Sequence, residues 1–376
     1  MLKTITQGVA AQLIDLGDQD MLASVLSSSN NALLTESYGN LLRQQQAVSG
    51  TGIDTGLAVK IAAYQGQMNH QAQYFQQSNL SGLINAVTNT SNFAALMSAF
   101  SNGLSVDNAQ LVVQRRLYAQ QINELADLAE DYQVGAQATL TRFQVAADGL
   151  APLETAYDQA IGQLISGLSS AAQQLDQDIA KLNQAIADNI QAIVDQADKA
   201  GAGVRQLGQA ILATLTLKDD AKAGGDAKPA DATNKAGDPS EYMISGITAL
   251  SSGVAGSSQA AKDLRSNNDK LATAYQALAS VNSMITVARS VQAQSQLFAE
   301  SYRNTLRNVT RLPESWRQIG NAFRKAALAW QNLNDDDDLA RIRRNVSLCN
   351  QEWQLLAQQV AEIKSSYAGN GTLPNA

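Results

Sequence analysis

The chain has 376 residues, of which 34 are acidic and 27 basic, and its net charge is −7. This balance argues against nucleic acid as a partner, because phosphate binding needs clustered Lys and Arg. One histidine and one cysteine exclude an internal disulfide and a Cys/His metal site, and an aromatic content of 5% argues against the core of a compact enzyme.

The N-terminal part of the chain is predicted to contain two amphipathic helices. The first covers residues 30–48 and ends at a glycine cluster in residues 50–56, and the second covers about 57–77. Residues 1–20 contain no continuous apolar run, so we expect no Sec signal peptide there. Because no segment reaches eighteen consecutive apolar residues, the chain is expected to be soluble as made.

Three long stretches then carry apolar residues alternately four and three positions apart, the spacing of helices packed lengthwise. The first is residues 111–146, and a tight corner is expected after it at 148–152. The second is expected to be one helix over 153–212, and the third covers 264–309. Since globular domains do not hold helices of about 60 residues, we predict an all-α, elongated up-down bundle.

Two further helices are predicted near the C-terminus, over residues 314–333 and 339–367. The acidic run between them provides Asp337 or Asp338 as an N-cap for the last helix, whose positive end favours carboxylates. On that helix, the spacing of Cys349 from its apolar neighbours predicts a small core residue instead of a reactive thiol.

The two longest predicted helices flank residues 206–261 and are expected to run antiparallel. We therefore divide the chain into a helical-bundle tail, residues 1–205 and 262–376, and a head insertion at one tip, residues 206–261. The centre of the head, residues 218–241, is dominated by Ala, Gly, Asp and Lys, so a solvated polar loop is expected there. The pattern of the arms on either side allows a small β-hairpin or a short helical hairpin.

The arms of the head are its most apolar parts. The second arm opens a stretch of twenty uncharged residues, 242–261, which as a helix would span the hydrocarbon core of a bilayer. Its many Ser and Thr residues make it too polar for a free-standing transmembrane helix. The residues expected to contact the membrane are Ile211, Leu212, Leu215, Leu217, Met243, Ile244, Ile247, Leu250 and Val254. A face of small residues that would let helices approach closely is formed by Ser245, Ala249, Gly253 and Ser257.

The alternative for these arms is that they fold on each other or on the tail and never touch lipid. Elsewhere, His70 lies among glutamines and is expected at the surface. The acidic run 335–338 lacks the spaced oxygen ligands and the glycine of a calcium loop. We find no pair of a nucleophile and a base, so the sequence predicts no catalysis, no cofactor and no metal.

This arrangement resembles the cytolysin A family of α-pore-forming toxins. The resemblance rests on long helices that flank an insertion built from 211–217, a polar loop and 242–256. The arrangement is particularly similar to that of the components of haemolysin BL, Nhe and the motility-associated killing factor proteins. It implies a soluble monomer whose apolar hairpin, often called the β-tongue, is tucked away. On membrane contact the head would open, enter the bilayer and associate with other subunits in a ring, without catalysis.

The arms are less apolar than those of the strongly lytic members of that family. The resemblance therefore implies one component of a secreted multi-protein toxin, either a pore-lining chain or a hydrophilic assembly partner, which acts at a host membrane with homologous components. The alternative is a structural or secretion-apparatus protein of the flagellin-like or translocator-like kind. A filament subunit should carry apolar heptads near both termini, whereas residues 1–20 are only weakly apolar.

Overall fold

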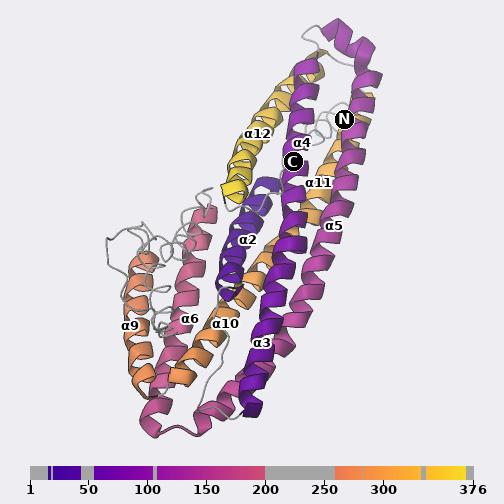
Figure 1. The fold of residues 1–376 in the computed structure, drawn as a ribbon. Coiled ribbons are helices and arrows are strands. Elements are labelled where there is room, and N and C mark those ends of the chain that lie inside the picture. Colours follow the sequence, from indigo (N-terminus) through magenta and orange to yellow (C-terminus); the bar gives the residue numbers. More distant parts are fainter. Residues whose placement is uncertain are drawn as a thin grey trace, which may run out of the picture. The chain divides into compact units, whose positions relative to one another are not determined.

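The fold was analysed in a computed structural model, and every element in its described residues is helical (Figure 1). The described residues are 16–17, 20–43, 55–104, 108–199, 259–281, 283–331 and 336–369. The predicted all-α class is confirmed. Within these ranges, no helix combines the length and the apolar character that crossing a membrane requires.

The chain forms two compact units. Unit 1 consists of Met1–Ser29, Asn79–Phe143 and Leu306–Ala376, and unit 2 of Asn30–Ser78 and Gln144–Thr305. The helices of the described ranges are α2 (Met21–Arg43), α3 (Thr55–Tyr74), the π-helical turn η1 (Phe75–Leu80), α4 (Ser81–Gly103), α5 (Asn108–Ser166), α6 (Ser170–Lys199), α9 (Gln259–Val281), α10 (Ser283–Val309), α11 (Arg311–Gln331) and α12 (Asp336–Gly369).

Unit 1 has an aromatic core. Phe93 of α4 packs on Trp316 and Phe323 of α11, with ring centroids 5.3 and 5.4 Å apart, and on Trp353 of α12 at 4.8 Å. The indole Nε1 of Trp353 donates to the carbonyl oxygen of Leu16 at 2.7 Å, which satisfies its only polar group. Four aromatic rings thus pack together where α4, α11 and α12 meet.

In unit 2, α6 and α9 lie side by side and run antiparallel, as Figure 1 shows. Most of their buried residues follow the four–three spacing. The buried residues are Ala172, Asp176, Ile179, Ile186, Ile190 and Val194 on α6, and Leu264, Asn268, Leu271, Ala274, Tyr275 and Leu278 on α9. The amide of Asn183 donates to the hydroxyl of Tyr275 at 3.3 Å across this pair. The two helices next to residues 200–258 therefore pair as the sequence predicted. All of the predicted head except its last three residues, 259–261, lies outside the described residues.

The predicted corner at 148–152 is wrong, because α5 continues without a break to Ser166 and contains Pro152. The apolar residues spaced alternately four and three apart form a row along one face of α5, its apolar seam. This seam includes Leu150 before the proline and Tyr157 and Ile161 after it, all of them buried. Burial of this seam outweighs the one backbone hydrogen bond that proline removes. The chain instead turns at residues 167–169, so the predicted helix 153–212 is divided between α5 and α6.

Other helix boundaries also differ from the prediction. The first helix begins at Met21 instead of residue 30, and the sequence analysis did not find α4. The third repeat is two helices, since α9 ends at Val281 and α10 begins at Ser283. Helix α12 begins at Asp336, which places Asp337 and Asp338 inside its first turn and makes neither of them the N-cap. Carboxylates in a first turn still favour the positive end of the helix.

Candidate functional site: the polar interior of unit 2

The head residues predicted to contact lipid, or to form the small-residue face, all lie within 200–258, outside the described residues. They stay predictions. His70 is exposed and Cys349 is buried, as expected. In the described ranges, no group of three or more His, Cys, Asp or Glu side chains could hold a metal ion.

The interior of unit 2 around α10 is polar. The buried polar residues of α10 in this unit are Thr286, Ser290, Gln292, Ser295, Ser301, Asn304 and Thr305. Buried polar groups are stable only when they are hydrogen-bonded. The Thr35 hydroxyl of α2 donates to the Asn31 carbonyl oxygen at 2.8 Å, and its oxygen lies 2.8 Å from the Ser301 hydroxyl and 2.9 Å from that of Thr305. A hydroxyl cluster thus joins α2 to α10.

A buried ion pair joins α10 to α6. The Arg289 guanidinium donates through Nε and Nη2 to the two carboxylate oxygens of Asp176, whose side chain is 5% exposed. The same guanidinium donates to the Gln292 side-chain oxygen, and the Gln292 amide donates to Asp158 of α5. This bidentate geometry is the strong form of an Arg–carboxylate contact. It connects three helices through four side chains.

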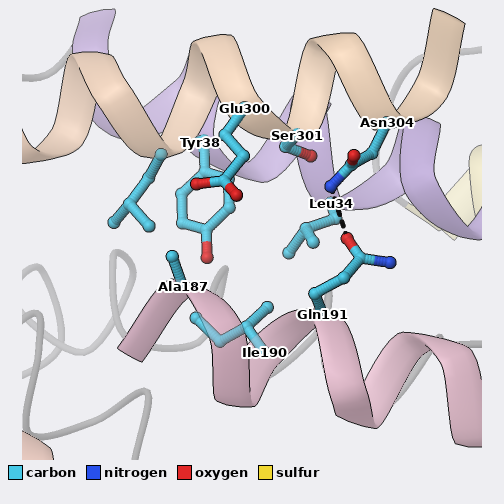
Figure 2. Close-up of a pocket in the computed structure, with 9 residues that line it drawn as sticks. Leu34, Tyr38, Ala187, Ile190, Gln191, Glu300, Ser301 and Asn304 are labelled. Atoms are coloured by element: carbon cyan, nitrogen blue, oxygen red, sulfur yellow. Dashed lines mark hydrogen bonds between the residues drawn. The ribbon is translucent and has the colours of Figure 1, made fainter. Parts of the chain in front are cut away.

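A second polar contact joins the same two helices. Figure 2 shows the Asn304 amide of α10 donating to the Gln191 side-chain oxygen of α6, at 2.6 Å. This pair and the Asp176–Arg289 pair each join residues 113 apart in the sequence. Helices α6 and α10 therefore run parallel in a fixed register, held at two points about four helical turns apart.

The cavity beside this contact is very small. Figure 2 shows Tyr38, Ala187 and Glu300 around it, and its volume is about 10 Å³. That volume accommodates about one water molecule and no larger ligand. Burial raises the pKa of the Tyr38 phenol well above its ordinary value, and the negative charge of Glu300 raises it further. The phenol is therefore neutral at physiological pH and is not a candidate base.

At Glu154 of α5, burial affects the pKa more strongly than an ion pair does. It pairs with Arg303 of α10, and its side chain is 14% exposed. Burial nevertheless raises the pKa of Glu154 more than the attraction of Arg303 lowers it, and the nearby Asp158 raises it further. The folded state thus binds a proton at Glu154 more tightly than the unfolded state does. The ionised carboxylate therefore reduces stability at neutral pH.

We accordingly expect Glu154→Gln to leave the thermal midpoint at pH 7 unchanged or slightly higher, although the substitution removes an ion pair. As the pH falls through the raised folded-state pKa, wild-type Glu154 takes up a proton and any advantage of the variant disappears. Thermal unfolding of both chains between pH 7 and pH 4 measures this. A variant that is clearly less stable at pH 7 would show that the ion pair outweighs burial.

The sequence analysis missed this polar interior, although it contained one signal. Gln292 and Ser295 occupy seam positions of the third repeat, where apolar residues belong. Polar residues at seam positions indicate polar partners on other helices. Within the described residues, the polar contacts of this site orient helices, and the cavity beside them is too small for a ligand larger than water.

The fold defines a class of proteins built from long packed helices, and comparison with solved structures specifies the class. Soluble SmhA of the tripartite α-pore-forming toxin Smh from Serratia marcescens is 36% identical, with a TM-score of 0.76, over 96% of this chain and 98% of that one. The HblL1 toxin component of Bacillus cereus is 14% identical, with a TM-score of 0.69, over 93% and 97%. The SmhB pore of the Smh toxin is 17% identical, with a TM-score of 0.54, over 93% and 99%.

At their low identities, HblL1 and SmhB support the fold alone, whereas SmhA matches along nearly the whole of both chains. The chain belongs to the family of tripartite α-pore-forming toxin components. No protein-family model and no curated protein matches it. This assignment sets aside the alternative of a flagellin-like or translocator-like structural protein.

Proposed function

We propose that this chain is the SmhA-like component of a three-part pore-forming toxin. It is a secreted, soluble monomer without enzymatic activity that joins homologous components on a host membrane. The observation that carries the proposal is its 36% identity to SmhA, compared with 17% to SmhB of the same toxin. SmhB is the Smh component whose pore is solved, so the resemblance to SmhA favours a role as a partner of the pore-forming chain.

The sequence of the head supports a role that depends on partners. Residues 242–261 are uncharged and long enough to span a bilayer as a helix, but Ser, Thr and Gly leave little net transfer energy. Such a helix is stable in lipid only when its hydroxyl face lines water and its small-residue face packs on neighbours. Met243, Ile247 and Leu250 would then face lipid, and a partner with a more apolar hairpin would complete the outer wall.

The polar interior of unit 2 is consistent with a head that opens. Helices α6 and α9 adjoin residues 200–258, and α6 is held on α10 by the ion pair and the amide pair described above. When the helices separate completely, water can replace each of these contacts, so the net cost of separation is modest. An entirely apolar interface of the same area would resist separation more strongly.

The test is dye release from liposomes by the purified chain, alone and with the products of neighbouring genes. We expect no release by the chain alone, and release when two partner components are present. Omitting either partner should abolish it. Full lysis by this chain alone at nanomolar concentration would refute the dependence on partners. No lysis in any combination would refute the proposed toxin role.

A further inference from the structure

Unit 1 carries an open apolar groove between α4 and α5. Its volume is about 410 Å³, and its walls include Leu96 and Phe100 of α4 and Leu117 and Tyr118 of α5. Leu96 and Leu117 are 46% and 49% exposed, and Val113, one turn before Leu117, is 83% exposed. Large apolar side chains that gather around an open groove mark an interaction site.

The outer face of α12, also in unit 1, carries a row of exposed residues that fits this groove. Arg344, Leu348, Glu352 and Leu355 are all exposed, the two leucines by 52% and 51%. Their spacing of four, four and three residues places them on one face of the helix. The row therefore presents a positive charge, a leucine, a negative charge and a second leucine in that order.

A negative charge in the groove complements this row. Glu124 of α5 lines the groove and is exposed, so it can pair with Arg344 of α12. With Arg344 opposite Glu124, an antiparallel α12 carries Leu348 and Leu355 back along the groove-lining residues of α5, whereas a parallel α12 would carry both leucines past Leu125, the last of those residues.

The same antiparallel arrangement also aligns the apolar groups. Leu348 then lies against the stretch of α5 that contains Leu117 and Gln121. Leu355 lies at the end where Val113 is exposed. Apolar contacts beside a pair of complementary charges are the usual composition of a specific interface.

From this match we propose that α12 of one copy of the chain docks into the α4–α5 groove of a second copy. The inference deepens the proposed function, on whose membrane-bound assembly it rests. The contact joins two different surfaces, so every copy offers a groove to one neighbour and an α12 face to another. Such heterologous contacts close into a ring when the rotation between copies permits it.

Mixed-cysteine cross-linking tests the proposal. Cys349 is the only cysteine, so every variant carries Cys349→Ala. Chains with Gln121→Cys are mixed with chains with Leu348→Cys on phosphatidylcholine–cholesterol liposomes, with and without the two partner components. We expect a disulfide-linked dimer of this chain in the mixture. The matched control is Val134→Cys, which places an exposed cysteine on α5 away from the groove and should yield little dimer with Leu348→Cys.

Charge reversal makes the test specific. Glu124→Arg in the groove copy should lower the dimer yield at least about tenfold, because it opposes Arg344. Adding Arg344→Glu to the other copy should restore the yield. Cross-linking no greater than that of the Val134→Cys control, or no rescue by the reversed pair, would overturn the interface. A cross-link from Gln121→Cys to a partner component in place of a second copy would overturn the choice of occupant.

These readouts are independent of lysis. A chain that cross-links as expected but never releases dye with any partner retains the interface and loses the proposed toxin role. A chain that is lytic with its partners and shows no cross-link above the control retains the toxin role and loses the interface.

Discussion

Arg289→Met is expected to lower the free energy of unfolding by about 3–5 kcal/mol, because it leaves the carboxylate of Asp176 buried and uncompensated. The Asp176 side chain is 5% exposed, so water cannot replace the lost guanidinium while α6 and α10 remain packed. Gln292 also loses the donor to its side-chain oxygen. Urea unfolding followed by far-UV circular dichroism measures the change through its midpoint and slope.

A second substitution separates loss of the ion pair from loss of packing. Replacing both members, Asp176→Leu with Arg289→Met, is expected to recover most of the stability, since apolar residues of similar volume often substitute well for a buried pair. Arg317→Met is the control. Arg317 pairs with Glu314 on one helix and is 50% exposed, so its loss should lower the free energy of unfolding far less than the loss of Arg289 does. Equal losses for Arg289→Met and Arg317→Met would contradict a buried ion pair.

The helices of this fold could be predicted because the four–three spacing of apolar residues is a local signal. Their ends could not, as Pro152 and Gly167 illustrate. Pro152 was expected to mark a corner, yet the seam of α5 continues through Tyr157 and keeps the helix intact. The chain turns instead near Gly167, where no proline signals it. Which of two local breakers ends a helix depends on the tertiary burial around it.

The polar interior of unit 2 could not be predicted from the sequence, for a different reason. Asp176 and Arg289 lie 113 residues apart, and neither residue alone shows that it will be buried or paired. An aspartate on an amphipathic helix is most often solvated. Gln292, like Ser295, was a local indication, because it interrupts an apolar seam. Only the packing of α6, α10 and α5 brings its partners together.

Ile247→Lys is expected to weaken association of the toxin assembly with liposomes by roughly a hundredfold, because a lysine near the bilayer centre costs about 2.5–3.5 kcal/mol. Ile247 lies outside the described residues, so the expectation rests on the apolar face that it shares with Met243 and Leu250. Liposome flotation with both partner components present measures the association, and thermal unfolding shows whether the variant remains folded.

Ala230→Lys supplies the matched control for Ile247→Lys. It adds the same charge within the polar stretch 218–241, which under the proposed function stays in water, so flotation should match wild type. A folded Ile247→Lys variant that floats as well as Ala230→Lys would show that the second arm never enters lipid. The alternative, in which the arms fold on each other or on the tail, would then hold. If flotation weakens for Ile247→Lys and not for Ala230→Lys, the apolar face of the second arm lies in the bilayer, since both variants carry the same added charge.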